Sequence, residues 1–115
     1  MATAQQIRET AAENLGIFGE GETLGSYETD DLDQAYNEVY KELEGLELTA
    51  WLQTSNVPDQ FARAVAMLVA EARATKYQIP DNRYQRIKFE AIEAMSSIRK
   101  QQAVAKMGQT QIENF

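Results

Sequence analysis

The stretch that decides the fold runs from Phe61 to Ala74 and reads FARAVAMLVAEARA. When this stretch is wound as a helix, apolar residues fall on nearly every side and leave no broad polar face. A helix of that kind is surrounded by other elements, so residues 61–74 are predicted to be the central helix of a helical domain. Its uncharged part, Ala64 to Ala70, is far shorter than the roughly 20 residues that cross a membrane, so we expect no membrane contact.

A first helix is predicted before it, from about Ala4 to Leu15. Thr3 is a suitable N-cap residue, and Gly16 supplies the left-handed position that commonly closes a helix. Residues 16–25 hold four glycines and are therefore expected to form a loop. The apolar residues of this loop, Phe18 among them, should pack against the body.

A second helix is expected to begin near Thr29 and to end around Gly45 to Glu47. Asp30, Asp31 and Asp33 would then fall near its start, where the helix dipole favours acids. The residues predicted to be buried recur every three or four positions: Leu32, Ala35, Tyr36, Val39, Leu43 and Leu46. Residues 48–55 lack a helical pattern and are expected to form an extended connection anchored by Trp51.

A fourth helix is predicted after Pro80, because the residue before a proline is disfavoured in a helix. It should be capped at Asp81 and Asn82 and run to about Ala103. Its main apolar stripe comprises Tyr84, Ile87, Ala91, Met95 and Ile98, with Ile92 beside it. Phe89 lies on another side of this helix and is a candidate contact with a second subunit.

The last twelve residues, 104–115, are polar and interrupted by a glycine. They carry Met107, Ile112 and Phe115 at spaced positions, which suits an extended C-terminal arm that docks onto a partner. The predicted fold is therefore an all-α, single small domain of about four helices over residues 1–103, followed by this arm.

Composition argues against an enzyme. The chain holds no cysteine and no histidine, which removes thiol nucleophiles, the commonest general base and the commonest metal ligands. The glycine-rich loop follows no strand and carries Glu20 and Glu22, which would repel a phosphate. Asp30, Asp31 and Asp33 lack the spacing of a calcium loop. We expect no catalytic residues, no metal and no cofactor.

Charge is distributed unevenly along the chain, whose net charge is −7. Residues 1–57 hold twelve acids and two bases, whereas residues 58–115 hold six acids and nine bases. Two differently solvated faces would explain this, and so would head-to-tail self-association through unlike surfaces. Arg83 and Arg86 lie at the start of the fourth helix, the position from which the recognition helix of a helix-turn-helix protein contacts bases. The net negative charge of the whole chain disfavours DNA recognition.

Three motifs in order carry a family resemblance: residues 14–22 (NLGIFGEGE), residues 57–61 (VPDQF) and residues 77–80 (YQIP). Together with the alanine-rich helix, this order resembles the head-to-tail adaptor, or head-completion, proteins of short-tailed bacteriophages over about residues 4–103. The resemblance implies a virion structural protein of the neck, made in the host cytoplasm. Such subunits form a ring of twelve copies that binds the portal protein and the tail hub or nozzle.

The resemblance also implies that genomic DNA passes through the ring without sequence-specific binding. The segment after Ala103 would grip the portal or a neighbouring subunit through the three apolar residues of the arm. Candidate contacts between subunits are Phe18, Trp51, Arg83, Arg86 and Phe89. The alternative function, from a different class, is a small helical regulator that binds protein or DNA as a dimer.

Overall fold

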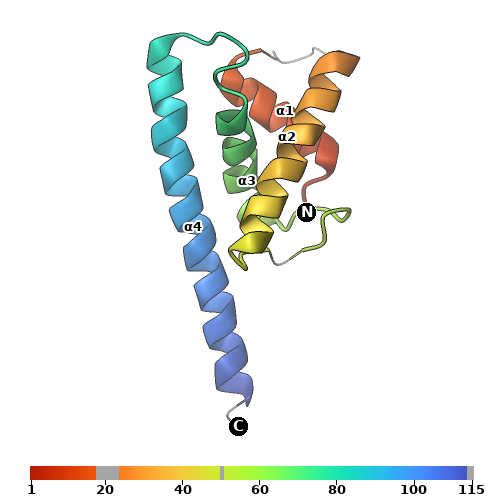
Figure 1. Cartoon of the computed structure of the whole chain (residues 1–115). Helices are drawn as coiled ribbons and strands as arrows, with labels where there is room; N and C mark the ends of the chain where they lie inside the picture. Colours follow the sequence, from red (N-terminus) through yellow and green to blue (C-terminus); the bar gives the residue numbers. More distant parts are fainter. Residues whose placement is uncertain (18–23, 50, 114–115) are drawn as a thin grey trace.

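The computed structural model describes residues 1–17, 24–49 and 51–113, and describes side chains as far as Val104. Its four helices are α1 (Ala4–Leu15), α2 (Ser26–Gly45), α3 (Asp59–Ala72) and α4 (Asp81–Glu113). In the described part of the chain the backbone forms no sheet, only one isolated bridge between Ala2 and Val57. The predicted all-α class is therefore confirmed (Figure 1).

The first helix has the predicted bounds and the predicted caps. The Thr3 hydroxyl accepts from the backbone N–H of Gln6 at 3.2 Å, and the Gln6 side chain accepts from the Thr3 N–H at 2.9 Å. This reciprocal pair satisfies two backbone donors at the helix start. Gly16 closes the helix with φ of 77°, a left-handed value that glycine adopts without strain.

The second helix begins three residues earlier than predicted, at Ser26 with Gly25 as N-cap. The N–H of Thr29 donates to the Gly25 carbonyl at 3.0 Å, so Thr29 lies inside the helix and caps nothing. Glycine is tolerated at an N-cap, and here no side chain among the described residues bonds the first backbone N–H groups, so no capping residue marks this start in the sequence. The predicted end at Gly45 is confirmed, but Leu46 is exposed, and the chain returns to the core at Leu48.

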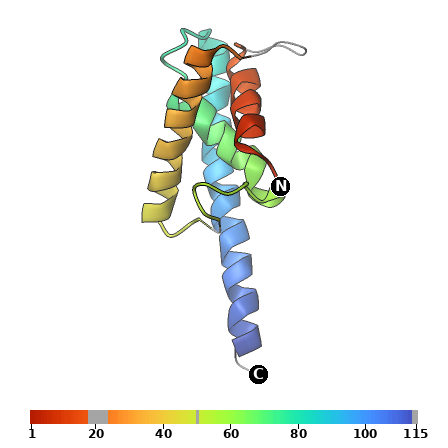
Figure 2. The ribbon, with the colours of Figure 1, turned by 90° about the vertical axis from the view of Figure 1, so that its right-hand side faces the viewer.

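The third helix is central, as predicted from its apolar surroundings. It packs against each of the other three helices, and its Val65, Ala66 and Val69 are fully enclosed. Pro58 precedes the first helical residue as the N-cap. The absence of a polar face on this helix is thus explained by helices on three sides (Figures 1 and 2).

The fourth helix is longer than predicted. It does not end near Ala103 but continues to Glu113, 33 residues in all, so residues 104–113 of the expected arm are helical. At 1.5 Å per residue its length is about 50 Å, which matches the 52 Å long axis of the molecule. Ala103, Lys106 and Met107 are good helix formers, and the single Gly108 costs only about 1 kcal/mol.

Ile98 is the last residue of α4 that belongs to the buried core, among the side chains described. Beyond it the helix leaves the body and projects from it as a single rod (Figures 1 and 2). The segment is therefore an arm in its position, although its backbone is helical. None of the described helices is both long enough and apolar enough to cross a membrane.

Candidate interaction surfaces

A buried carboxylate joins α2 to the turn between α3 and α4. Asp31 is only 6% exposed. Its carboxylate accepts from Lys76 Nζ at 2.7 Å, from the Tyr77 hydroxyl at 2.7 Å and from Arg73 Nε at 3.2 Å. Arg73 also donates to Glu38 at 2.9 Å. These contacts hold the turn that sets where α4 begins.

The electrostatics of this cluster favour an ionised Asp31. Burial alone would raise the pKa of Asp31, but the hydrogen bonds from Lys76 and Tyr77 and the charge of Arg73 together lower it. Burial and the contact with Asp31 raise the pKa of Tyr77 above its ordinary value, so its hydroxyl remains a donor. From the sequence, Asp31 was expected to be one of three acids near a helix start. The structure gives it three partners from residues 73–77.

The other two acids of that group have separate surroundings. Asp33 pairs with Arg8 Nη1 at 2.7 Å and so ties α2 to α1, whereas Asp30 is exposed. The acid of the first turn is Glu28. In the described part of the chain, no group of three or more acids is arranged to hold a metal ion.

Trp51 lies inside the subunit and not on its surface. Its indole is 8% exposed and stacks near Phe61, with ring centroids 5.2 Å apart. The indole N–H donates to the Tyr36 hydroxyl at 3.0 Å, and the Tyr40 hydroxyl donates to the Trp51 carbonyl at 2.8 Å. The predicted anchoring role is confirmed. The further prediction of a subunit contact stays a prediction, although partners within the chain cover most of the side chain.

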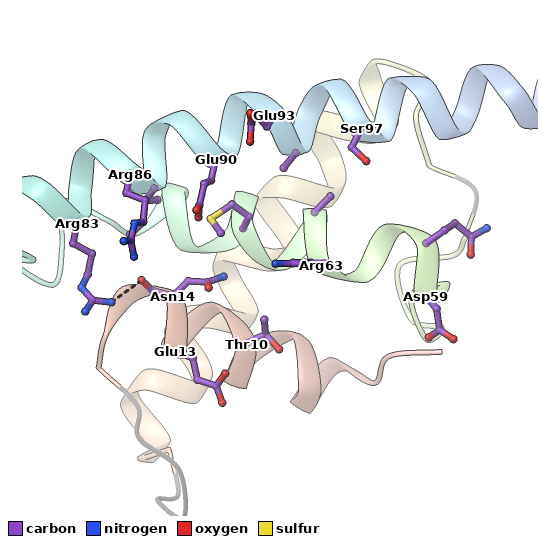
Figure 3. Close-up of a pocket in the computed structure, with 15 residues that line it drawn as sticks. Thr10, Glu13, Asn14, Asp59, Arg63, Arg83, Arg86, Glu90, Glu93 and Ser97 are labelled. Carbon is purple, nitrogen blue, oxygen red and sulfur yellow. Dashed lines mark hydrogen bonds between the residues drawn. The ribbon is translucent and has the colours of Figure 1, made fainter.

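Arg83, a second predicted interface residue, also has a role within the subunit. Its guanidinium donates to the Asn14 carbonyl at 3.4 Å, at the C-terminal end of α1 (Figure 3). A Cβ built on Gly16 would lie 3.0 Å from the Arg83 Cζ, so the absence of a side chain lets the guanidinium approach. A cation at this end of a helix is favoured by the helix dipole.

A polar groove runs beside this contact between α1, α3 and α4, with a volume of about 730 Å³. Arg86 and Glu90 reach into it from α4, while Arg63 extends along it from α3 (Figure 3). Its lining holds three arginines and four acids, so the opposite charges nearly balance and the groove attracts neither anions nor cations strongly. The predicted residue Arg86 is thus exposed on a mixed-charge wall.

A second groove, of about 240 Å³, lies on another side of α3. Among the described residues α2 and α4 both pack on α3 but not on each other, which leaves the groove between them. Its lining is mainly apolar with charges at the rim: Val39, Glu42, Leu43, Leu68, Glu71, Ala72, Lys88, Ala91, Ile92 and Met95. The periodicity of each helix predicted most of these apolar residues, but it could not indicate that α2 and α4 diverge.

Phe89 and Ile92 are large apolar residues on the outer side of α4. Phe89 is 62% exposed, as its predicted role in a subunit contact requires, and Ile92 is 71% exposed. Ile92 also lines the second groove. Two exposed apolar side chains one helical turn apart, beside an apolar groove, mark this side of the molecule as a candidate interaction surface.

The remaining predicted site residues are only partly placed. Met107 and Ile112 belong to the helical backbone of α4, but their side chains lie outside the described part of the structure. Phe18 and Phe115 lie outside the described residues altogether. Their predicted contacts with a neighbour or a portal stay predictions.

Comparison with known proteins found no matching family model, no matching curated protein and no matching solved structure.

Proposed function

We propose that this protein is a structural assembly subunit, a head-to-tail adaptor that forms a ring between the portal and the tail of a short-tailed bacteriophage. The proposal begins from the motifs of residues 14–22, 57–61 and 77–80. The observation that carries it is the projecting end of α4, which continues for fifteen residues past the last described core residue, Ile98. Arg99, Lys100, Gln101, Ala103 and Val104 are exposed on this segment, and an exposed helix that projects from the body is suited to bind another protein.

The charge distribution supports contacts between unlike surfaces. Helix α2 carries seven acids and one lysine, whereas α4 carries six bases and four acids. Within the subunit, Asp31, Glu38 and Asp33 are already paired with bases. Glu42 and Glu44 on α2 are exposed and available to a neighbour. A surface that differs from the one it meets forms a heterologous interface, which gives a closed ring when the rotation between neighbouring subunits closes.

The net charge of −7 supports a role around DNA in transit. A lining rich in lysine and arginine would hold the phosphates with a grip that depends on salt. An acidic ring would let the genome slide through without sequence-specific binding. In this proposal the partners are the portal, the tail hub or nozzle and further copies of the chain, and the location is the neck of the virion.

The test is the mass of the purified chain by light scattering, alone and then mixed with the portal protein encoded near it. We expect a monomer or a weak oligomer alone and a fixed, ring-like ratio of subunits on the portal. A stable dimer that ignores the portal would overturn the adaptor role. That result would favour the dimeric regulator, whose binding to DNA would then be measured with Arg86→Ala.

A further inference from the structure

We propose that the groove between α2 and α4 receives the projecting end of α4 from a second copy of this chain. This inference rests on the assembly role proposed above and names the surface that would receive the arm. The groove has the architecture of a helix-binding site, because α2 and α4 form two walls and α3 forms the floor. Amphipathic helices commonly bind in grooves of this kind through their apolar side.

The groove has a mainly apolar lining, with acids at its rim. Leu43, Leu68 and Met95 line it, one from each of the three helices. Glu42 on α2 and Glu71 on α3 are exposed at the rim, while Lys88 is the base on the α4 side. A helix that binds here should therefore combine apolar residues with an excess of positive charge.

The end of α4 has this composition. From Arg99 to Ile112 the sequence holds three bases and no acid. Val104 is 66% exposed, and the apolar residues at 104, 107 and 112 recur at a spacing compatible with one side of a helix. The helix from residue 99 to its end is about 22 Å long at 1.5 Å per residue, which is about four helical turns available to a second copy.

The end of α4 cannot occupy the groove of its own subunit. The upstream part of the same continuous helix is one wall of that groove, and the end leaves the body along the same axis (Figures 1 and 2). A second copy must therefore supply it. Because the donor segment and the receiving groove are different surfaces, each subunit can give its arm to one neighbour and receive one from another.

The experiment is site-directed disulfide cross-linking. Because the chain has no native cysteine, only the introduced cysteines can form a disulfide. Glu42→Cys and Val104→Cys are made in separate chains, because both residues are exposed and neither change should disturb the fold. One chain carries a mass tag, so that mixed and like-with-like dimers separate after mild oxidation. We expect the mixed dimer in several-fold excess over both like dimers.

A matched control replaces Glu42→Cys with Glu93→Cys, which is exposed on the polar groove at another side of α4. This pair should give no excess of mixed dimer.

A charge exchange adds a second readout. Glu71→Lys in the receiving chain should reduce the mixed dimer several-fold, and Lys100→Glu in the donor chain should restore it. A random mixture, or dimers formed only between two copies of the same variant, would overturn the inference.

Repeating the cross-linking on the portal separates this inference from the proposed function. A ring on the portal without the mixed cross-link would overturn the groove assignment and leave the adaptor role standing. If the mixed cross-link forms but the chain does not bind the portal, the groove assignment is supported and the adaptor role is overturned. No ring and no mixed cross-link would overturn both.

Discussion

At the scale of single residues, Asp31 links electrostatics to the placement of α4. Its carboxylate is held by Arg73, Lys76 and Tyr77, which belong to the turn between α3 and α4. This role could not be predicted from the sequence, because Asp31 is one of three neighbouring aspartates with similar local patterns. Its neighbour Asp30 is exposed. The orientation of α2 about its own axis decides which of the two aspartates faces the turn.

Asp31→Asn should lower the free energy of unfolding by about 2 kcal/mol, because it leaves Arg73 partly buried without its full counter-charge. The cost should stay below that of a fully buried pair, since Lys76 can turn into solvent. Urea unfolding followed by circular dichroism measures the change. Asp30→Asn is the matched control and should shift the free energy by less than about 0.5 kcal/mol. Equal effects of the two changes would contradict the role assigned to Asp31.

The same carboxylate should make stability depend on pH. The pKa of Asp31 is lowered in the folded protein from an ordinary value of 3.8. Its stabilising contribution is therefore fully present above the unfolded pKa and is lost as pH falls through the lower, folded pKa. The difference in unfolding free energy between the native chain and Asp31→Asn should be constant near neutral pH and shrink below about pH 4. A difference that stays constant on acidification would show that Asp31 does not act through its charge.

At the scale of elements, local sequence signals predicted the short helices better than the long one. Thr3 and Gly16 fixed both ends of α1, since a capping side chain and a left-handed glycine act through the backbone next to them. In helix α4 the polar residues after Ala103 and the glycine at 108 predicted loss of helix, yet the helix continues through Gly108 to Glu113. Glutamine and lysine are good helix formers, so a polar stretch does not by itself end a helix.

Gly16→Ala should destabilise the junction of α1 and α4 by about 1–2 kcal/mol, the cost of a left-handed conformation for an L-residue. The new Cβ would also press on the Arg83 guanidinium, 3.0 Å away. Gly45→Ala is a control that should raise the free energy of unfolding instead of lowering it. Gly45 is within α2 and has open space around its Cα, so alanine should add up to about 1 kcal/mol there. Thermal or urea unfolding of both variants checks the pair, and a Gly16→Ala protein as stable as the native chain would contradict this account.

At the scale of the whole molecule, the apolar stretch of residues 61–74 was enough to predict a central helix with others around it. The candidate site was less predictable, because a groove depends on the distance between α2 and α4 and not on the pattern of either. Phe89 could be assigned to an outer surface from its position on the helix, and it is exposed. Trp51 was predicted as an anchor, but its partners Tyr36 and Tyr40 could not be predicted, because they come from another element.

Removal of residues 104–115 should leave the stability of the fold unchanged but prevent assembly. The last described core residue is Ile98, so the truncated chain should unfold with a free energy within about 0.5 kcal/mol of the native value. If the projecting helix is the arm that joins subunits or grips the portal, the same chain should fail to form a ring on the portal in light scattering. Ring formation by the truncated chain would place the assembly contacts on the body. A large loss of stability would instead show that the end of α4 packs on its own subunit.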